Sequence, residues 1–165
     1  MADMKPSRIR RVAVAGLAVL SVGGLSACSL FAGPQYRDSN GQVTATASIG
    51  PSSFQVGDCL LTVPGTGDDS SDGASPAVGK LTVVPCSSPH QGEIYAIAKN
   101  LSSDPDSLDQ YCEQQFEAFD GITWDQSTLN INYFYTASQA TTDVQCVAYL
   151  DAGETTEASF KGSQL

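Results

Sequence analysis

The chain has 165 residues, which is enough for one domain and additional segments. Its net charge is −10, and from residue 28 onward 17 acidic side chains face only four basic ones. Because phosphate surfaces bind clustered Lys and Arg, this acid excess excludes nucleic-acid binding and disfavours contact with anionic headgroups. We interpret the excess as a solubilising surface.

The first 27 residues have the layout of a secretory signal peptide. Residues 1–11 are basic, residues 12–25 are apolar, and small residues follow. A helix over residues 12–25 would be about 21 Å long, short of the roughly 30 Å hydrocarbon core of a bilayer. The alternative is a permanent membrane helix over residues 12–32, but the second half of that run is rich in Gly and Ser. We predict a cleaved peptide over residues 1–27. Ordinary secretion is the default export route, with twin-arginine export as the alternative.

The tetrapeptide Leu25-Ser26-Ala27-Cys28 resembles a bacterial lipobox. The resemblance implies a diacylglyceryl thioether on the Cys28 sulfur and cleavage between Ala27 and Cys28. One acyl chain binds a protein to a bilayer only marginally, whereas two or more acyl chains, such as palmitate, anchor the protein stably. We therefore predict a lipoprotein anchored at the extracytoplasmic face of the cell membrane through Cys28.

Two segments of low complexity divide the remaining chain. Residues 28–53, rich in Gly, Ser, Thr and Ala, are expected to be the lipidated cysteine and a flexible tether. Residues 64–79 are expected to form a long loop, because apolar runs flank them on both sides. The folded domain is accordingly predicted over residues 54–163.

The apolar runs of this domain predict strands on both sides of one helix. The strands are expected at residues 54–63, 80–86, 93–99, 129–136 and 144–150. Ser103 or Asp104 can cap the helix, Pro105 lies in its first turn, and apolar residues from Leu108 to Phe119 recur at spacings of three and four. Residues 151–165 are polar and expected to fray, with Phe160 as a candidate for docking. The prediction is a small α+β fold with an antiparallel sheet of about five strands and one packed helix.

Four cysteines follow Cys28, and an even number in an exported chain predicts two disulfides. Four cysteines permit three pairings. Cys59 and Cys86 belong to consecutive strands, whereas Cys112 lies on the buried helix face and Cys146 lies within a strand. We therefore predict the pairs Cys59–Cys86 and Cys112–Cys146. The cysteines are too widely spaced for a zinc finger, and no C-x-x-C redox motif occurs.

The order of these motifs resembles the septum formation domain family of bacterial lipoproteins and membrane proteins. The resemblance covers about residues 54–163 and rests on Gly57-Asp58-Cys59, Cys86, Pro89-His90, Glu93, Cys112, Cys146 and the closing run 159–163. It implies a cell-envelope protein associated with division or septum building, and it implies no catalytic activity.

His90 is the only histidine, and it lies three residues before Glu93. A functional interpretation makes the two an acid–base pair or half a metal site. An H-x-x-E pair supplies at most two ligands, so we favour a structural role in which Pro89 stiffens the turn and the imidazole bonds to nearby backbone. Residues 68–73 have weak similarity to a calcium loop but lack its final Glu. We predict no catalytic residues, no metal and no cofactor.

Four aromatic residues raise the alternative of a binding surface. Trp124, Tyr133, Phe134 and Tyr135 could stack on sugars, although such residues more often belong to a core. The side of the strand that carries Asn130, Asn132 and Phe134 is a candidate partner surface. The first hypothesis is thus a non-enzymatic interaction module of the envelope with division proteins as partners. The alternative is an extracytoplasmic ligand-sensing or glycan-binding domain.

Overall fold

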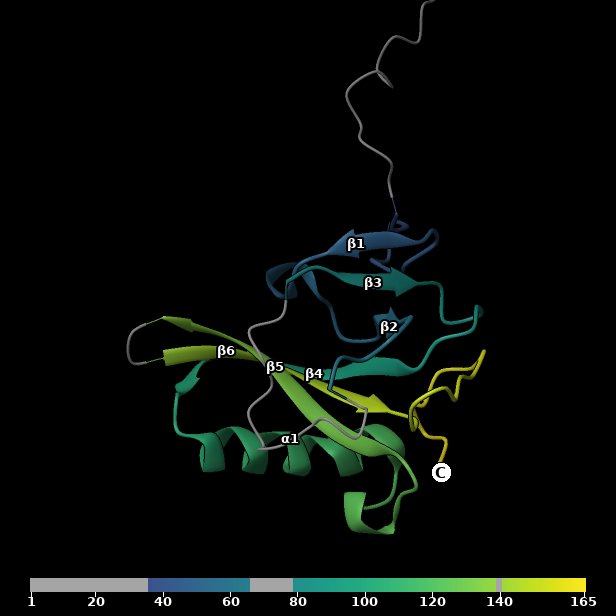
Figure 1. Ribbon diagram of the computed structural model, residues 1–165. Helices are drawn as coiled ribbons and strands as arrows, with labels where there is room; N and C mark the ends of the chain where they lie inside the picture. Colours follow the sequence, from purple (N-terminus) through teal and green to yellow (C-terminus); the bar gives the residue numbers. More distant parts are fainter. Residues whose placement is uncertain (1–35, 66–78, 139–140) are drawn as a thin grey trace, which may run out of the picture. The chain divides into compact units, whose positions relative to one another are not determined.

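The computed structural model describes residues 36–65, 79–138 and 141–165 (Figure 1). The predicted signal peptide, Cys28 and the weak calcium motif at residues 68–73 lie outside these residues. The described residues all belong to one compact unit. Within the described part of the chain, no helix is both long and apolar enough to cross a membrane.

The domain is built on one antiparallel sheet of six strands, one more than expected, in the order β1-β3-β2-β4-β6-β5. The strands are β1 (Ala47–Ile49), β2 (Cys59–Leu60), β3 (Leu81–Val84), β4 (Gly92–Ser102), β5 (Asn130–Ser138) and β6 (Thr141–Tyr149). A single α-helix and two short 3-10 helices, η2 (Pro51–Ser53) and η3 (Trp124–Gln126), complete the described elements. The predicted α+β class is confirmed.

Helix α1 spans Pro105–Asp120, where capping residues predicted it. The Asp104 carboxylate accepts a hydrogen bond from the Ser107 N–H, and Pro105 occupies the first turn. Gly121 ends the helix in the left-handed conformation, at φ 91°. The helix lies across one face of the sheet, against β4 and β5 (Figure 1).

Apolar side chains form two buried clusters in the domain. The helix-side cluster joins the buried face of α1 to β4, β5 and β6 through Tyr95, Leu108, Phe116, Phe119, Val144 and other residues. The second cluster contains Ile49, Phe54, Leu60, Val83, Ile94, Phe134 and Val147. Neighbouring strand residues such as Tyr133 and Phe134 belong to different clusters, as expected when successive side chains point to opposite faces of a sheet. The domain therefore has apolar packing on both faces.

The prediction of a tether over residues 28–53 is wrong for the described residues 36–53. Ala47, Ser48 and Ile49 pair with β3, and Arg37 forms a β-bridge with Val43. Phe54 and Ile49 are buried in the second cluster. A three-residue strand is too short to give a recognisable alternation, so the sequence pattern resembled a linker.

The first predicted strand, residues 54–63, is also shorter than expected. Within this range only Cys59 and Leu60 belong to a strand, because Gly57 turns the backbone at φ 91° just before them. By contrast, β4 continues three residues beyond its predicted end. Asn100, at φ 58°, marks a register shift in that extension, and its N–H donates to the Asp143 carboxylate.

The C-terminal segment is docked, and the expectation that residues 151–165 fray is wrong. Phe160 is 1% exposed and packs in the helix-side cluster. The Ser163 hydroxyl and the Gln164 N–H both donate to the Asp120 carboxylate at the end of α1. The predicted docking of Phe160 is therefore confirmed, and Ser163 and Gln164 are also bound to the domain.

Both predicted disulfides are present, Cys59–Cys86 and Cys112–Cys146. The first links β2 to the segment that follows β3, and the second links α1 to β6. Loops of 27 and 34 residues are closed. By the loop-entropy model each bond stabilises the fold by about 3–4 kcal/mol.

Candidate functional site

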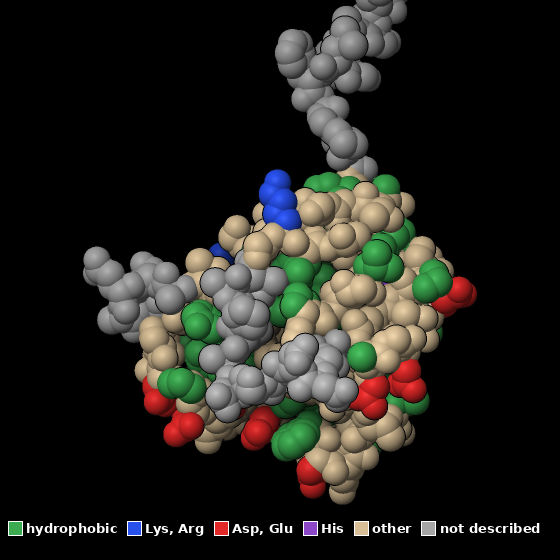
Figure 2. All heavy atoms as spheres, in the orientation of Figure 1, with side chains coloured by type: hydrophobic (Ala, Val, Ile, Leu, Met, Phe, Trp, Pro, Cys, Tyr) green, Lys and Arg blue, Asp and Glu red, His purple; other side chains and the backbone are tan. Residues whose placement is uncertain are grey.

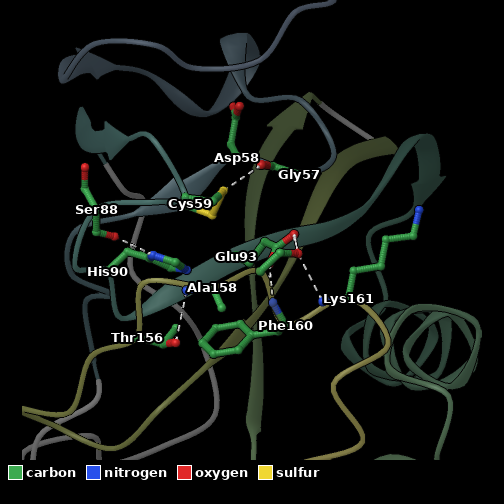
Figure 3. Close-up of a disulfide and its surroundings, with 12 residues drawn as sticks. Gly57, Asp58, Cys59, Ser88, His90, Glu93, Thr156, Ala158, Phe160 and Lys161 are labelled. Carbon is green, nitrogen blue, oxygen red and sulfur yellow. Dashed lines mark hydrogen bonds between the residues drawn. A yellow bond between two sulfur atoms is a disulfide. The ribbon is translucent and has the colours of Figure 1, made fainter.

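Most of the residues that carry the family resemblance meet at one end of the sheet (Figure 3), whereas Cys112 and Cys146 form the disulfide between α1 and β6. Cys59 is the register partner of Glu93 across β2 and β4, and His90 lies just before β4 begins. Thr156, Ser159 and the backbone of Phe160 reach the same place from the C-terminal segment. We call this group, Gly57-Asp58-Cys59, Cys86, His90, Glu93 and residues 156–160, the motif cluster.

Gly57 and Asp58 connect the N-terminal part of the domain to the central strand. The Gly57 N–H donates to the Ile94 carbonyl at 2.7 Å, and the Ile94 N–H donates to the Asp58 carbonyl at 2.9 Å. The turn that directs the chain into β2 requires φ 91° at Gly57, a conformation that other residues adopt at a cost. Cys86 Sγ lies 3.4 Å from the Gly57 carbonyl oxygen.

Asp58 is held by Arg37, a residue that the sequence analysis placed in the tether. The guanidinium donates from two nitrogens to the two carboxylate oxygens, at 2.5 and 2.7 Å. The Gln55 N–H donates to the same carboxylate at 2.8 Å. Asp58 keeps the pKa of the Arg37 guanidinium above its ordinary value. The one available signal was that Arg37 is the only basic residue between positions 12 and 79.

His90 is fully buried and bonded at three of its polar groups. Its backbone exchanges two hydrogen bonds of 2.9 Å with Thr156. Its Nδ1 lies 2.9 Å from the Ser88 carbonyl oxygen, which can only accept, so Nδ1 carries the proton. The expected bond from the imidazole to nearby backbone is thus confirmed. The remaining ring nitrogen, Nε2, has no hydrogen-bond partner among the described residues.

Glu93 is buried at 3% exposure and binds the C-terminal segment. Its carboxyl accepts from the Ser159 hydroxyl at 2.9 Å and from the Phe160 N–H at 2.7 Å. Burial raises the pKa of Glu93 above its ordinary value, and the two hydrogen bonds oppose that rise. The sequence pattern indicates Glu93 but gives no signal for these partners, which lie 66 and 67 residues away.

The structure brings His90 and Glu93 together with Cys59. One ligand-type atom from each residue lies within 4.8 Å of the other two. All three side chains are buried, so a substrate in solution does not reach them. The geometry therefore supports a structural role better than acid–base catalysis.

The four predicted aromatic residues do not form one stacking platform. Phe134 and Tyr133 are buried in different clusters, and Trp124 is 43% exposed on η3. The candidate partner surface through Asn130, Asn132 and Phe134 is wrong at Phe134, which is fully buried and packs near Phe54 at 6.3 Å between ring centroids. Long-range packing explains the result, since strand alternation alone does not reveal whether the opposite face of the sheet is covered.

Comparisons of the chain with protein-family models, curated proteins and solved structures each found no match. The likeness to the septum formation family consequently rests on the motif residues alone. The structure assigns those residues to contacts within the domain, and function has to be argued from that geometry.

Replacing Arg37 by Ala should lower the free energy of unfolding by about 3–5 kcal/mol, because it leaves the Asp58 carboxylate buried without its counter-charge. Urea denaturation measures this change. Lys80→Ala, at an exposed position, is the matched control and should change the value by less than about 0.5 kcal/mol. A loss below about 1 kcal/mol for Arg37→Ala would show that the ion pair is dispensable.

Glu93 should make stability depend on pH. Since its pKa in the folded protein is raised above the ordinary 4.5, the folded state keeps the proton to higher pH than the unfolded state does. The contribution of Glu93 to the free energy of unfolding should therefore fall as pH rises from about 4.5 through the raised pKa. Urea denaturation at a series of pH values, for the wild type and Glu93→Gln, isolates this contribution as the difference between the two curves.

The matched control for that series is Glu154→Gln, at an exposed carboxylate. Its difference curve should be flat where the Glu93→Gln curve falls. A difference for Glu93→Gln that is constant or rises with pH would contradict the assignment.

Proposed function

We propose that this chain is a lipid-anchored protein of the cell envelope whose domain is a non-enzymatic interaction module associated with septum formation or cell division. The observation that carries the proposal is the motif cluster. Asp58, His90 and Glu93 are buried and engaged in contacts within the domain. The residues that carry the family resemblance thus maintain the fold, and the binding of a partner protein is left to the surface.

The compartment is supported independently of the motif. Two disulfides indicate an extracytoplasmic, oxidising environment, since cytosolic thiols are kept reduced. The proposal adds an acylated Cys28 that fixes the mature chain to the membrane. The lipobox tetrapeptide before the domain supports this addition.

The surface supports a protein partner better than a glycan. Figure 2 shows acidic side chains over the lower part of the face in view and basic side chains over its upper part. A partner with basic side chains would complement the acid excess, which favours specific and rapid association. The glycan-binding alternative needs an aromatic platform, and the residues predicted to form one are divided between core and surface.

Lipid anchoring predicts a specific product. In the producing bacterium, the mature chain should begin at Cys28, carry acyl groups and partition into detergent. Cys28→Ala should remain unprocessed and acyl-free, whereas Ser29→Ala, at the next residue, should behave as wild type. Intact mass spectrometry and detergent partitioning measure both properties. An acyl-free wild-type chain that still carries residues 1–27 would overturn this part of the proposal.

If the domain is associated with cell division, division proteins should lie next to it in the cell. Crosslinking in dividing cells, followed by capture of the tagged chain, should recover division proteins. Residues 1–35 fused to an unrelated domain are the control, because they supply the same anchor without the described fold, and they should recover none. Binding of the purified domain to cell-wall glycan, with no division protein recovered, would favour the sensing alternative.

A further inference from the structure

The motif cluster contains the donor set of a transition-metal site. The ligand atoms of Cys59, His90 and Glu93, a sulfur, a nitrogen and an oxygen, lie within 4.8 Å of one another. Figure 3 shows the His90 imidazole and the Glu93 carboxyl on the same side of the disulfide of Cys59, toward Phe160. The pairing of β2 with β4 brings Cys59 to His90 and Glu93. The wide spacing of the cysteines in the sequence, which argued against a zinc finger, therefore does not exclude this site.

His90 has the orientation that a metal ligand needs. Ligating imidazoles typically donate their other N–H to a backbone carbonyl or a carboxylate, which fixes the tautomer. Here Nδ1–H donates to the Ser88 carbonyl, which leaves Nε2 as the ring nitrogen with an available lone pair. Nε2 is buried without a hydrogen-bond partner among the described residues, and such groups are rare enough to require an explanation.

Glu93 keeps acceptor capacity for a cation. A carboxylate has about four lone-pair sites. The Ser159 hydroxyl and the Phe160 N–H use two of them, one on each oxygen. These two donors also fix the carboxylate plane, as outer partners do around metal-binding carboxylates.

While the disulfide is closed, the Cys59 sulfur cannot act as a metal ligand. The thiolate is the form of cysteine that binds metals, and a disulfide sulfur carries no such charge. Cys59 is fully buried, whereas Cys86 is partly exposed. An external thiolate would therefore attack the Cys86 sulfur. Both residues of the other disulfide, Cys112 and Cys146, are buried, so that bond is protected.

We propose that reduction of Cys59–Cys86 opens a zinc-type site formed by Cys59, Cys86, His90 and Glu93. A dithiol reductant attacks Cys86 Sγ, the bond between the two sulfurs breaks, and Cys59 leaves as a thiolate. The second thiolate of the reductant then releases Cys86 and ends as the oxidised disulfide, so two electrons pass to the chain. The metal binds both thiolates, His90 Nε2 and the Glu93 carboxylate, and any thiol protons pass to solvent.

Zinc is the cation class that this donor set favours. Two thiolates, one imidazole and one carboxylate supply four ligands of the borderline-soft kind, which suits tetrahedral Zn²⁺. Hard cations such as Mg²⁺ and Ca²⁺ prefer sites made of oxygen atoms. Oxidation closes the site and reduction opens it, so the disulfide and the metal are alternative occupants of one place.

Cobalt titration tests the proposal. The intact mature chain is treated with a phosphine reductant, and differential alkylation confirms that Cys59–Cys86 opens while Cys112–Cys146 stays closed. Added Co²⁺ should then give thiolate-to-cobalt charge transfer and the intense visible bands of a tetrahedral site, at one ion per chain, displaced by Zn²⁺. The oxidised chain should give no thiolate-to-cobalt signal. His90→Gln should weaken binding by more than about tenfold.

A second variant covers the case in which the reduced chain loses its fold, monitored by circular dichroism. Cys86→Ser frees the Cys59 thiol beside His90 and Glu93 without a reductant and should bind Co²⁺ with one thiolate. Cys59→Ser is the matched control and should bind more weakly. The proposal is overturned if the reduced chain binds no Co²⁺, if His90→Gln leaves the affinity unchanged, or if both the reduced chain and Cys86→Ser unfold.

Discussion

The burial of the Glu93 carboxyl is the constraint on which the rest of the domain depends. A buried carboxyl is costly unless its oxygens are hydrogen-bonded, and the donors here are Ser159 and the Phe160 backbone. The chain must therefore return after β6 and cross the end of the sheet. Once it does, Phe160 fills the helix-side cluster and Thr156 pairs with His90. One polar requirement thus determines the position of the C-terminal segment.

The opposite end of the chain is held by a second polar anchor, the Arg37–Asp58 pair. Asp58 also forms backbone contacts with β4 through Ile94. The two anchors therefore converge on neighbouring residues of β4, Glu93 and Ile94. Two disulfides reinforce the domain, Cys59–Cys86 within the motif cluster and Cys112–Cys146 between α1 and β6. A small domain with its apolar core divided between two sheet faces gains much from such links.

The sequence predicted the features that depend on neighbouring residues, but it did not predict the contacts between residues far apart in the chain. The cap at Asp104 and the start at Pro105 follow from interactions within one helical turn, so the beginning of α1 was predicted at its observed place. The cysteine pairs followed from the order of strands and helix. The position of residues 36–53 did not, because it depends on Arg37 finding Asp58 and on β1 finding β3. In the site, the importance of His90 and Glu93 was visible, but their partners in residues 156–160 had no local signal.

Because the motif residues are buried, the family resemblance argues for a shared fold and not for a shared reaction. If His90 and Glu93 met solvent, their pattern would argue for chemistry on a substrate. Because they bond to Ser88, Ser159 and the Phe160 backbone, the pattern instead describes how the two ends of the domain close on β4. The unpartnered Nε2 of His90 is the exception, since no contact among the described residues requires an imidazole nitrogen there. The imidazole also packs against the Phe160 ring, at 5.7 Å between ring centroids, but this contact leaves Nε2 unused, and a bound metal ion would give that nitrogen a partner.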